Sequence, residues 1–159
     1  MASTGLKRKL EGEIELRVGA ADVFHELYRD KPHEISNIYP EFVQGCDLHD
    51  GAYGTPGSII YWRYTLDGKA QVAKEIIEMV DEKNKKIRFK VIEGHLLDDY
   101  NSFVFVSQVI SEGDELCLVK WTLEYEKKHS GIPEPSSFMD QLIDSARRID
   151  EHHHRQNKN

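Results

Sequence analysis

Seven segments of the chain alternate between apolar and polar residues with a period of two, and most are separated only by short turns. This alternation is typical of β-strands that bury one face. Connections this short cannot hold the crossover that parallel strands need, so the pattern predicts an antiparallel meander. The expected strands span residues 6–18, 42–49, 58–66, 69–81, 86–93, 101–111 and 115–127.

Turn-forming residues stand at the connections of this meander. Asp67-Gly68 is the sharpest signal, because glycine tolerates the positive φ that a tight hairpin requires. The other connections carry glycine, proline, asparagine or aspartate at 51–57, 81–84, 93–94 and 112–114. Segment 51–57 lacks the lysine of a phosphate-binding P-loop and precedes no helix, so we interpret it as a turn.

Three segments have helical periodicity instead. The first follows the first strand, has its apolar residues on one side and is interrupted by Pro32. Residues 33–39 predict a second short helix with Ile35 and Ile38 inward. A long helix is expected from Ser136 to Arg155, with Ser136 or Ser137 as its N-cap. Its apolar stripe consists of Phe138, Met139, Leu142, Ala146 and Ile149.

The order of these elements predicts the fold class. A sheet of seven strands twists and must curl, and the helices are the only elements that can cover its concave face. We therefore expect an α+β fold in which a curved, seven-stranded antiparallel sheet wraps around the long C-terminal helix, with two short helices after the first strand. No linker or repeat divides the sequence, so residues 1–159 are expected to form one domain.

Composition excludes several classes of function. The net charge of -7 argues against nucleic-acid binding, which depends on lysine and arginine. No apolar run approaches 18 residues and the first 15 residues hold no signal peptide, so we expect a cytoplasmic protein without membrane insertion. Cys46 and Cys117 lack the spacing of a zinc site or a disulfide scaffold. The consecutive histidines 152–154 point about 100° apart on a helix, so neither metal nor cofactor is expected.

Large apolar side chains fall on the inward parity of the expected strands and helices. A helix-wrapped sheet this wide can leave space that one helix does not fill, and such space binds apolar ligands. The same rings could instead pack into a solid core. The expected ligand-contacting residues are Leu27, Tyr28, Ile35, Ile38, Trp62, Tyr64, Ile87, Phe89, Val91, Phe103, Phe105, Trp121, Leu123, Tyr125, Phe138, Leu142, Ala146 and Ile149. Among them, Tyr28, Tyr64 and Tyr125 would orient the ligand by hydrogen bonds.

Several motifs resemble one family. Gln44–Gly51 resembles the QGCDLHEG segment of plant major latex proteins, and it is followed by a similar glycine loop. Lys90–Leu97 and Tyr100–Phe103 are similar to the family's VIEGDLMKEYKSF, although His95 replaces a usual acidic residue. Leu123–Lys127 and Ile149–His153 also match. The chain therefore resembles the major latex protein-like members of the birch-pollen-allergen (Bet v 1) superfamily, which has a START-like, helix-grip fold.

This resemblance implies a large internal cavity for sterols, fatty acyl lipids, flavonoids, cytokinins, brassinosteroids or other apolar plant compounds. We expect the protein to carry or buffer such a hydrophobic small molecule in defence or stress responses. The C-terminal helix would be an adjustable wall, and the glycine loop 51–57 would gate or stabilise the cavity. A monomer or weak dimer is expected.

Two alternatives remain open from the sequence. Some members of the wider superfamily catalyse condensations or isomerisations with ionisable groups inside the cavity, and Lys120 and His95 are the candidates here. Strand parity, however, places Lys120 on the outer face. The acidic pairs Glu75/Glu78, Asp98/Asp99 and Glu124/Glu126 are interpreted as surface ion pairs or a solvated face. A partner-binding module, the second alternative, would require an exposed apolar patch.

Overall fold

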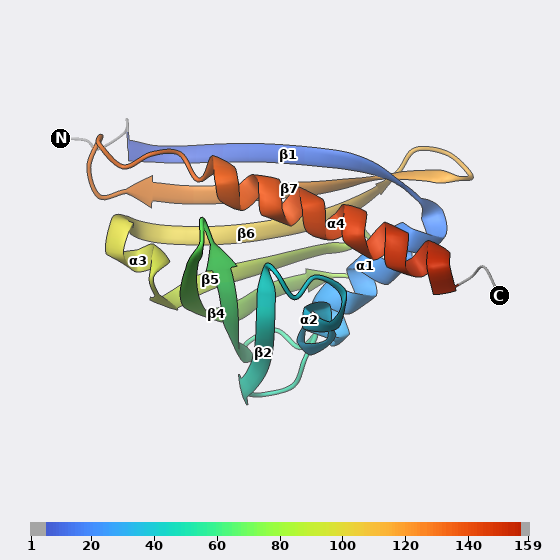
Figure 1. Cartoon of the computed structure of the whole chain (residues 1–159), viewed down its shortest axis with the longest axis horizontal. Coiled ribbons are helices and arrows are strands. Elements are labelled where there is room, and N and C mark those ends of the chain that lie inside the picture. Colours follow the sequence, from blue (N-terminus) through green and yellow to red (C-terminus); the bar gives the residue numbers. More distant parts are fainter. Residues whose placement is uncertain (1–5, 157–159) are drawn as a thin grey trace.

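The computed structural model describes residues 6–156 and places seven strands in one curved antiparallel sheet (Figure 1). The strands lie in the order β1-β7-β6-β5-β4-β3-β2, so that only β1 leaves the sequential meander. Their bounds are β1 Lys7–Arg17, β2 Val43–Asp50, β3 Ile59–Leu66, β4 Lys69–Asp81, β5 Lys86–Gly94, β6 Tyr100–Ser111 and β7 Leu116–Lys127. The predicted meander and fold class are confirmed.

The helices occupy the predicted places, with one addition. Their bounds are α1 Val18–Asp30, the 3-10 turn η2 Pro32–Glu34, α2 Ile35–Ile38, α3 Leu96–Asp99 and α4 Ser136–Gln156. The helix α3 was not predicted, because a single turn of four residues is too short to show helical periodicity. The first strand ends one residue earlier than predicted, since α1 begins at Val18.

The sheet curves because several strands carry irregularities that bend them. Register shifts occur in β2–β3, in β4–β5 next to Glu75, and in β6–β7. The β3–β4 hairpin turns tightly at Asp67 and Gly68, whose φ angles of 53° and 78° match the predicted turn chemistry. At the end of β5, a Cβ on Gly94 would lie 2.3 Å from the Val72 carbonyl oxygen, so this close approach requires glycine.

The long helix α4 runs along the concave side of the sheet, with its C-terminal half beside α1 (Figure 1). Its buried face contains the five predicted stripe residues and also Ser145. Gly12 of β1 lets α4 approach the sheet, because a Cβ there would lie 2.6 Å from the Met139 sulfur.

The predicted serine cap of α4 is wrong. The helix begins with the bond from the Met139 amide to the Pro135 carbonyl at 3.1 Å, so Ser136 is already helical. The Ser137 hydroxyl instead donates to Asp67 at 3.0 Å, which ties the helix to the β3–β4 hairpin. The segment before α4 is held by Glu134, which accepts a hydrogen bond from Tyr125 at 2.5 Å and pairs with the buried Lys127.

The two outer strands of the sheet are β1 and β2. In β1, the odd-numbered positions from Lys7 to Arg17 carry charged side chains that are exposed, while Leu10, Ile14 and Leu16 turn toward the core.

Among residues 6–156, no helix is both long enough and apolar enough to cross a membrane.

Candidate ligand-binding cavity

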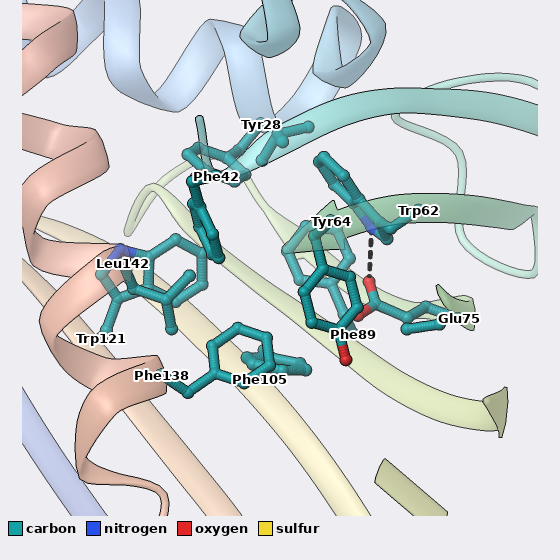
Figure 2. A pocket seen from close by; sticks show the side chains of 12 residues that line it. Tyr28, Phe42, Trp62, Tyr64, Glu75, Phe89, Phe105, Trp121, Phe138 and Leu142 are labelled. Carbon is teal, nitrogen blue, oxygen red and sulfur yellow. Dashed lines mark hydrogen bonds between the residues drawn. The ribbon is translucent and has the colours of Figure 1, made fainter. Parts of the chain in front are cut away.

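A cavity of about 50 Å³ lies between the concave face of the sheet, α1 and the first half of α4 (Figure 2). Strands β3 to β7 and the start of β2 supply most of its wall, which is mainly aromatic. The lining residues are Tyr28, Phe42, Val43, Trp62, Tyr64, Ala73, Glu75, Phe89, Phe105, Trp121, Phe138 and Leu142. Trp62 and Glu75 lie on one side of it in Figure 2, and Trp121, Leu142 and Phe138 on the other.

The structure brings eight of the eighteen predicted contact residues to this cavity. They are Tyr28, Trp62, Tyr64, Phe89, Phe105, Trp121, Phe138 and Leu142. The other ten belong to the surrounding core or pack against it: Leu27, Ile35, Ile38, Ile87, Val91, Phe103, Leu123, Tyr125, Ala146 and Ile149. Parity identified the face that each side chain occupies, but it could not tell which buried side chains border open space.

Four lining residues were not predicted. Phe42 and Val43 lie where α2 leads into β2, and Ala73 and Glu75 lie in β4. Glu75 shares its parity with the buried Ala73 and Ile77, so the alternation of β4 held a signal for its inward position. The abundance of lysine and arginine in the chain instead favoured a surface ion pair or a solvated face for Glu75.

The cavity is smaller than the resemblance implies. One water needs roughly 10–15 Å³, so about 50 Å³ holds a few waters, whereas drug-sized ligands occupy pockets of roughly 300–1,000 Å³. The cavity is small because the Phe138 ring of α4 projects into the space. Its ring centre lies 5.1 Å from that of Phe105, 5.3 Å from that of Tyr64 and 5.9 Å from that of Phe42. A larger ligand therefore requires these rings or α4 to move.

The three tyrosines expected to orient a ligand already have partners in the protein. The Tyr28 hydroxyl is 2.9 Å from Ser145 Oγ on α4, and the Tyr64 hydroxyl donates to Gln71 at 3.0 Å. Tyr125 donates to Glu134 and does not line the cavity. Burial raises the pKa of Tyr28 and Tyr64, so both hydroxyls stay neutral at physiological pH.

Glu75 is the most unusual group in the cavity wall. Only 5% of the surface of Glu75 is exposed to solvent, and Trp62 Nε1 donates a hydrogen bond to its Oε1 at 2.9 Å. Loss of solvent around the carboxyl raises its pKa from 4.5 to about 8, although the bond from Trp62 acts in the opposite direction. The interpretation of Glu75 as a surface residue is therefore wrong. The interpretation as a surface ion pair is correct for Glu78 and Glu124, whose carboxylates each lie 2.9 Å from the Arg88 guanidinium on the outer face.

The two residues considered for catalysis lie elsewhere. Lys120 faces outward as its parity predicts, with Nζ 3.1 Å from Glu11 of the neighbouring strand. His95 precedes α3, and its Nδ1 accepts a hydrogen bond from the Val72 amide at 3.0 Å. Neither residue lines the cavity.

The glycine loop closes on itself, as the turn interpretation predicted. Gly51, Gly54 and Gly57 all have positive φ, and the Ala52 amide donates to the Ser58 hydroxyl at 2.9 Å. The Thr55, Gly57 and Ser58 amides donate to backbone carbonyls, which leaves them unavailable to a phosphate. Loop residue Tyr53 stacks on His33 of η2 with ring centres 4.8 Å apart, which fixes the loop beside the short helices.

The two cysteines are not joined by a disulfide. Cys46 and Cys117 are both free and buried, and burial raises the pKa of each thiol. Within the described part of the chain, no three His, Cys, Asp or Glu side chains are grouped to hold a metal ion.

A curved sheet closed by a long helix over an apolar cavity defines the helix-grip class of ligand-binding proteins. Residues 5–155 match the Pathogenesis-related protein Bet v 1 family, and the chain belongs to it.

Several of the proteins to which this chain is similar are major latex protein-like. MLP-like protein 31 of Arabidopsis thaliana is 42% identical over 151 residues, which cover 94% of this chain and 88% of that protein. The crystal structure of major latex-like protein 151 from Panax ginseng has a TM-score of 0.88 at 42% identity and covers 94% of this chain and 99% of its own. Norcoclaurine synthase of Thalictrum flavum, with a TM-score of 0.76 at 20% identity over 96% of this chain and 89% of its own, shares the fold.

Proposed function

We propose that the protein binds a hydrophobic small molecule in the cavity between the sheet and α4 and carries or buffers it. The observation that supports this most is the aromatic wall of the cavity, to which both the sheet and a single helix contribute. Membership of the Bet v 1 family, whose fold binds ligands, supports the same function. A role in defence or stress, exerted in the cytoplasm by a monomer or weak dimer, belongs to this proposal.

Binding must enlarge the cavity. The first half of α4 contributes Phe138 and Leu142 to the wall, and both meet the sheet through apolar side-chain contacts. Such contacts are non-directional, so a small shift of α4 exchanges them for contacts with a ligand. Burying about 300 Å² of apolar ligand surface contributes about 7 kcal/mol, from which the cost of moving the rings is subtracted. Because about 7 kcal/mol corresponds to a Kd of about 10 μM before this cost, we expect Kd values of about 10–100 μM and tolerance of several ligand shapes.

The test uses the neutral fluorescent probe N-phenyl-1-naphthylamine, titrated into the full chain and displaced by sterol, acyl and flavonoid ligands. Leu142→Trp fills the cavity, and Asp140→Trp places the same ring on the exposed side of α4 as a control. We expect Leu142→Trp alone to weaken probe binding at least tenfold. Absence of binding at probe concentrations up to about 100 μM, or equal binding by both variants, would overturn the proposal.

One observation favours a second function, that of an enzyme. Glu75 is a buried carboxyl in the cavity whose pKa of about 8 suits proton transfer near neutral pH. Lys120 and His95 no longer support this alternative, because they lie outside the cavity. Conversion of a bound ligand, followed by mass spectrometry and lost in Glu75→Gln, would establish an enzyme. Release of every bound ligand unchanged would refute it.

A further inference from the structure

The cavity wall carries one acidic group and no basic one. Among the twelve lining residues, Glu75 is the only one with a carboxyl, and none is lysine, arginine or histidine. The remaining polar side chains of the wall are Tyr28, Tyr64, Trp62 and Trp121, which are neutral. The protein therefore supplies no counter-charge for Glu75 inside the cavity.

The hydrogen bonds leave the Glu75 carboxyl free to interact with a ligand. Trp62 Nε1 donates to Oε1 and fixes the orientation of the carboxyl at the cavity wall (Figure 2). Within residues 6–156 the structure records no second hydrogen-bond partner for this carboxyl. The neighbouring hydroxyls of Tyr28 and Tyr64 bond to Ser145 and Gln71 instead.

We propose that this cavity selects apolar molecules that carry a basic nitrogen, whose protonated form pairs with ionised Glu75, over apolar carboxylic acids of the same size. This inference rests on the proposed function, since it concerns the ligand of the same cavity. A buried carboxylate is unfavourable without a cation, and an incoming ammonium group provides both the opposite charge and a hydrogen-bond donor. A ligand carboxylate would bring a second negative charge beside Glu75.

The pairing predicts a characteristic pH dependence. The titratable groups that face Glu75 from other elements are Tyr28 of α1, Cys46 of β2 and Tyr64 of β3. Burial raises the pKa of all three, so they stay neutral between pH 6 and 8 and Glu75 alone titrates there. With a pKa of about 8, the ionised fraction of Glu75 rises about fiftyfold over this range, and the affinity for a permanently protonated amine rises in proportion.

The experiment compares three probes with one apolar body: 2-(1-naphthyl)ethylamine, 2-(1-naphthyl)ethanol and 1-naphthylacetic acid. Their affinities for the full chain are measured by calorimetry at pH 6, 7 and 8. We expect the amine to bind at least tenfold more tightly than the acid at pH 8 and to gain about fiftyfold from pH 6 to pH 8. The affinity of the alcohol should stay constant.

Two variants locate the effect. Glu75→Gln should abolish the pH dependence of amine binding, whereas Glu78→Gln, on the exposed side of the same strand, should behave as the unaltered protein. If Glu75→Gln does not fold, the comparison of amine and alcohol across pH in the unaltered protein decides the matter alone.

The outcomes separate this inference from the proposed function. Equal affinity for amine and alcohol at every pH would overturn the selection of basic nitrogen but leave carriage intact. Tighter binding of the acid would also overturn the selection. Failure of all three probes to bind at millimolar concentration would overturn carriage in this cavity, and the inference with it.

Discussion

Replacing Glu75 with glutamine should stabilise the protein at neutral and alkaline pH. In the folded protein the pKa of Glu75 is about 8, whereas its ordinary value is 4.5. Between these two pH values the unfolded chain releases the proton and the folded chain retains it. The stability that the neutral carboxyl confers is therefore complete below pH 4.5 and is lost as the pH rises to 8.

The magnitude follows from the two pKa values. They differ by about 3.5, and each pKa unit corresponds to about 1.4 kcal/mol, so the loss amounts to about 5 kcal/mol. Glutamine keeps an oxygen that can accept the Trp62 hydrogen bond but has no proton to release. We therefore expect the free energy of unfolding of Glu75→Gln, relative to the unaltered protein, to increase by about 4 kcal/mol from pH 4.5 to pH 8, where each end point is half titrated.

The assay is urea unfolding monitored by tryptophan fluorescence at several pH values, since Trp62 and Trp121 are both buried. Contributions from all other titrating groups cancel in the difference between the two proteins. Glu78→Gln serves as the control, because this exposed carboxylate pairs with Arg88 on the surface and should change stability by less than about 1 kcal/mol. A difference between Glu75→Gln and the unaltered protein that is constant across pH would refute the reasoning.

Three further substitutions, with Gly68→Ala as a control for one of them, test a ring contact in the cavity, a buried ion pair and a close backbone approach. Phe138→Ala should lower the free energy of unfolding by about 3–5 kcal/mol and yet tighten the binding of bulky apolar probes, as calorimetry and probe displacement would show. Glu134→Ala leaves the ammonium of Lys127 buried without its carboxylate and should cost about 3 kcal/mol in urea unfolding, whereas an unchanged midpoint would contradict the pairing. Gly94→Ala forces a Cβ to 2.3 Å from a carbonyl oxygen of β4 and should cost about 3 kcal/mol or more. Gly68→Ala, where the added Cβ meets nothing within 4 Å, should cost only about 1 kcal/mol, and equal losses would contradict this account.

The fold could be predicted because local and global signals agree. The Asp67-Gly68 turn fixes the register of the β3–β4 hairpin, in which Leu66 faces Lys69. The spacing of Phe138, Leu142 and Ile149 likewise defines the face of α4 that turns toward the sheet. The helix α3 was not predicted, because four residues are too few for apolar positions to recur at helical spacing.

The site was less predictable because a cavity is a property of packing. Phe103 and Phe105 lie two residues apart and both point into the interior, as their parity predicts, but only Phe105 borders the cavity. Which of the two rings borders the cavity depends on where α4 places the Phe138 ring against the sheet. That contact joins positions far apart in the sequence, so the local pattern does not predict it. Glu75 was missed for a different reason. Its parity matches that of the buried Ala73 and Ile77, but the abundance of lysine and arginine favoured a surface ion pair.

The charged outer strand β1 has a consequence for how molecules meet in solution. A strand at the end of a sheet offers unpaired backbone groups on which a second chain can extend the sheet. In β1 the exposed glutamates at 11, 13 and 15 would come close to any such chain, and their desolvation and repulsion oppose pairing. Replacing them with valine would barely disturb the fold of one molecule, yet it would turn eleven residues of strand into a template for aggregation.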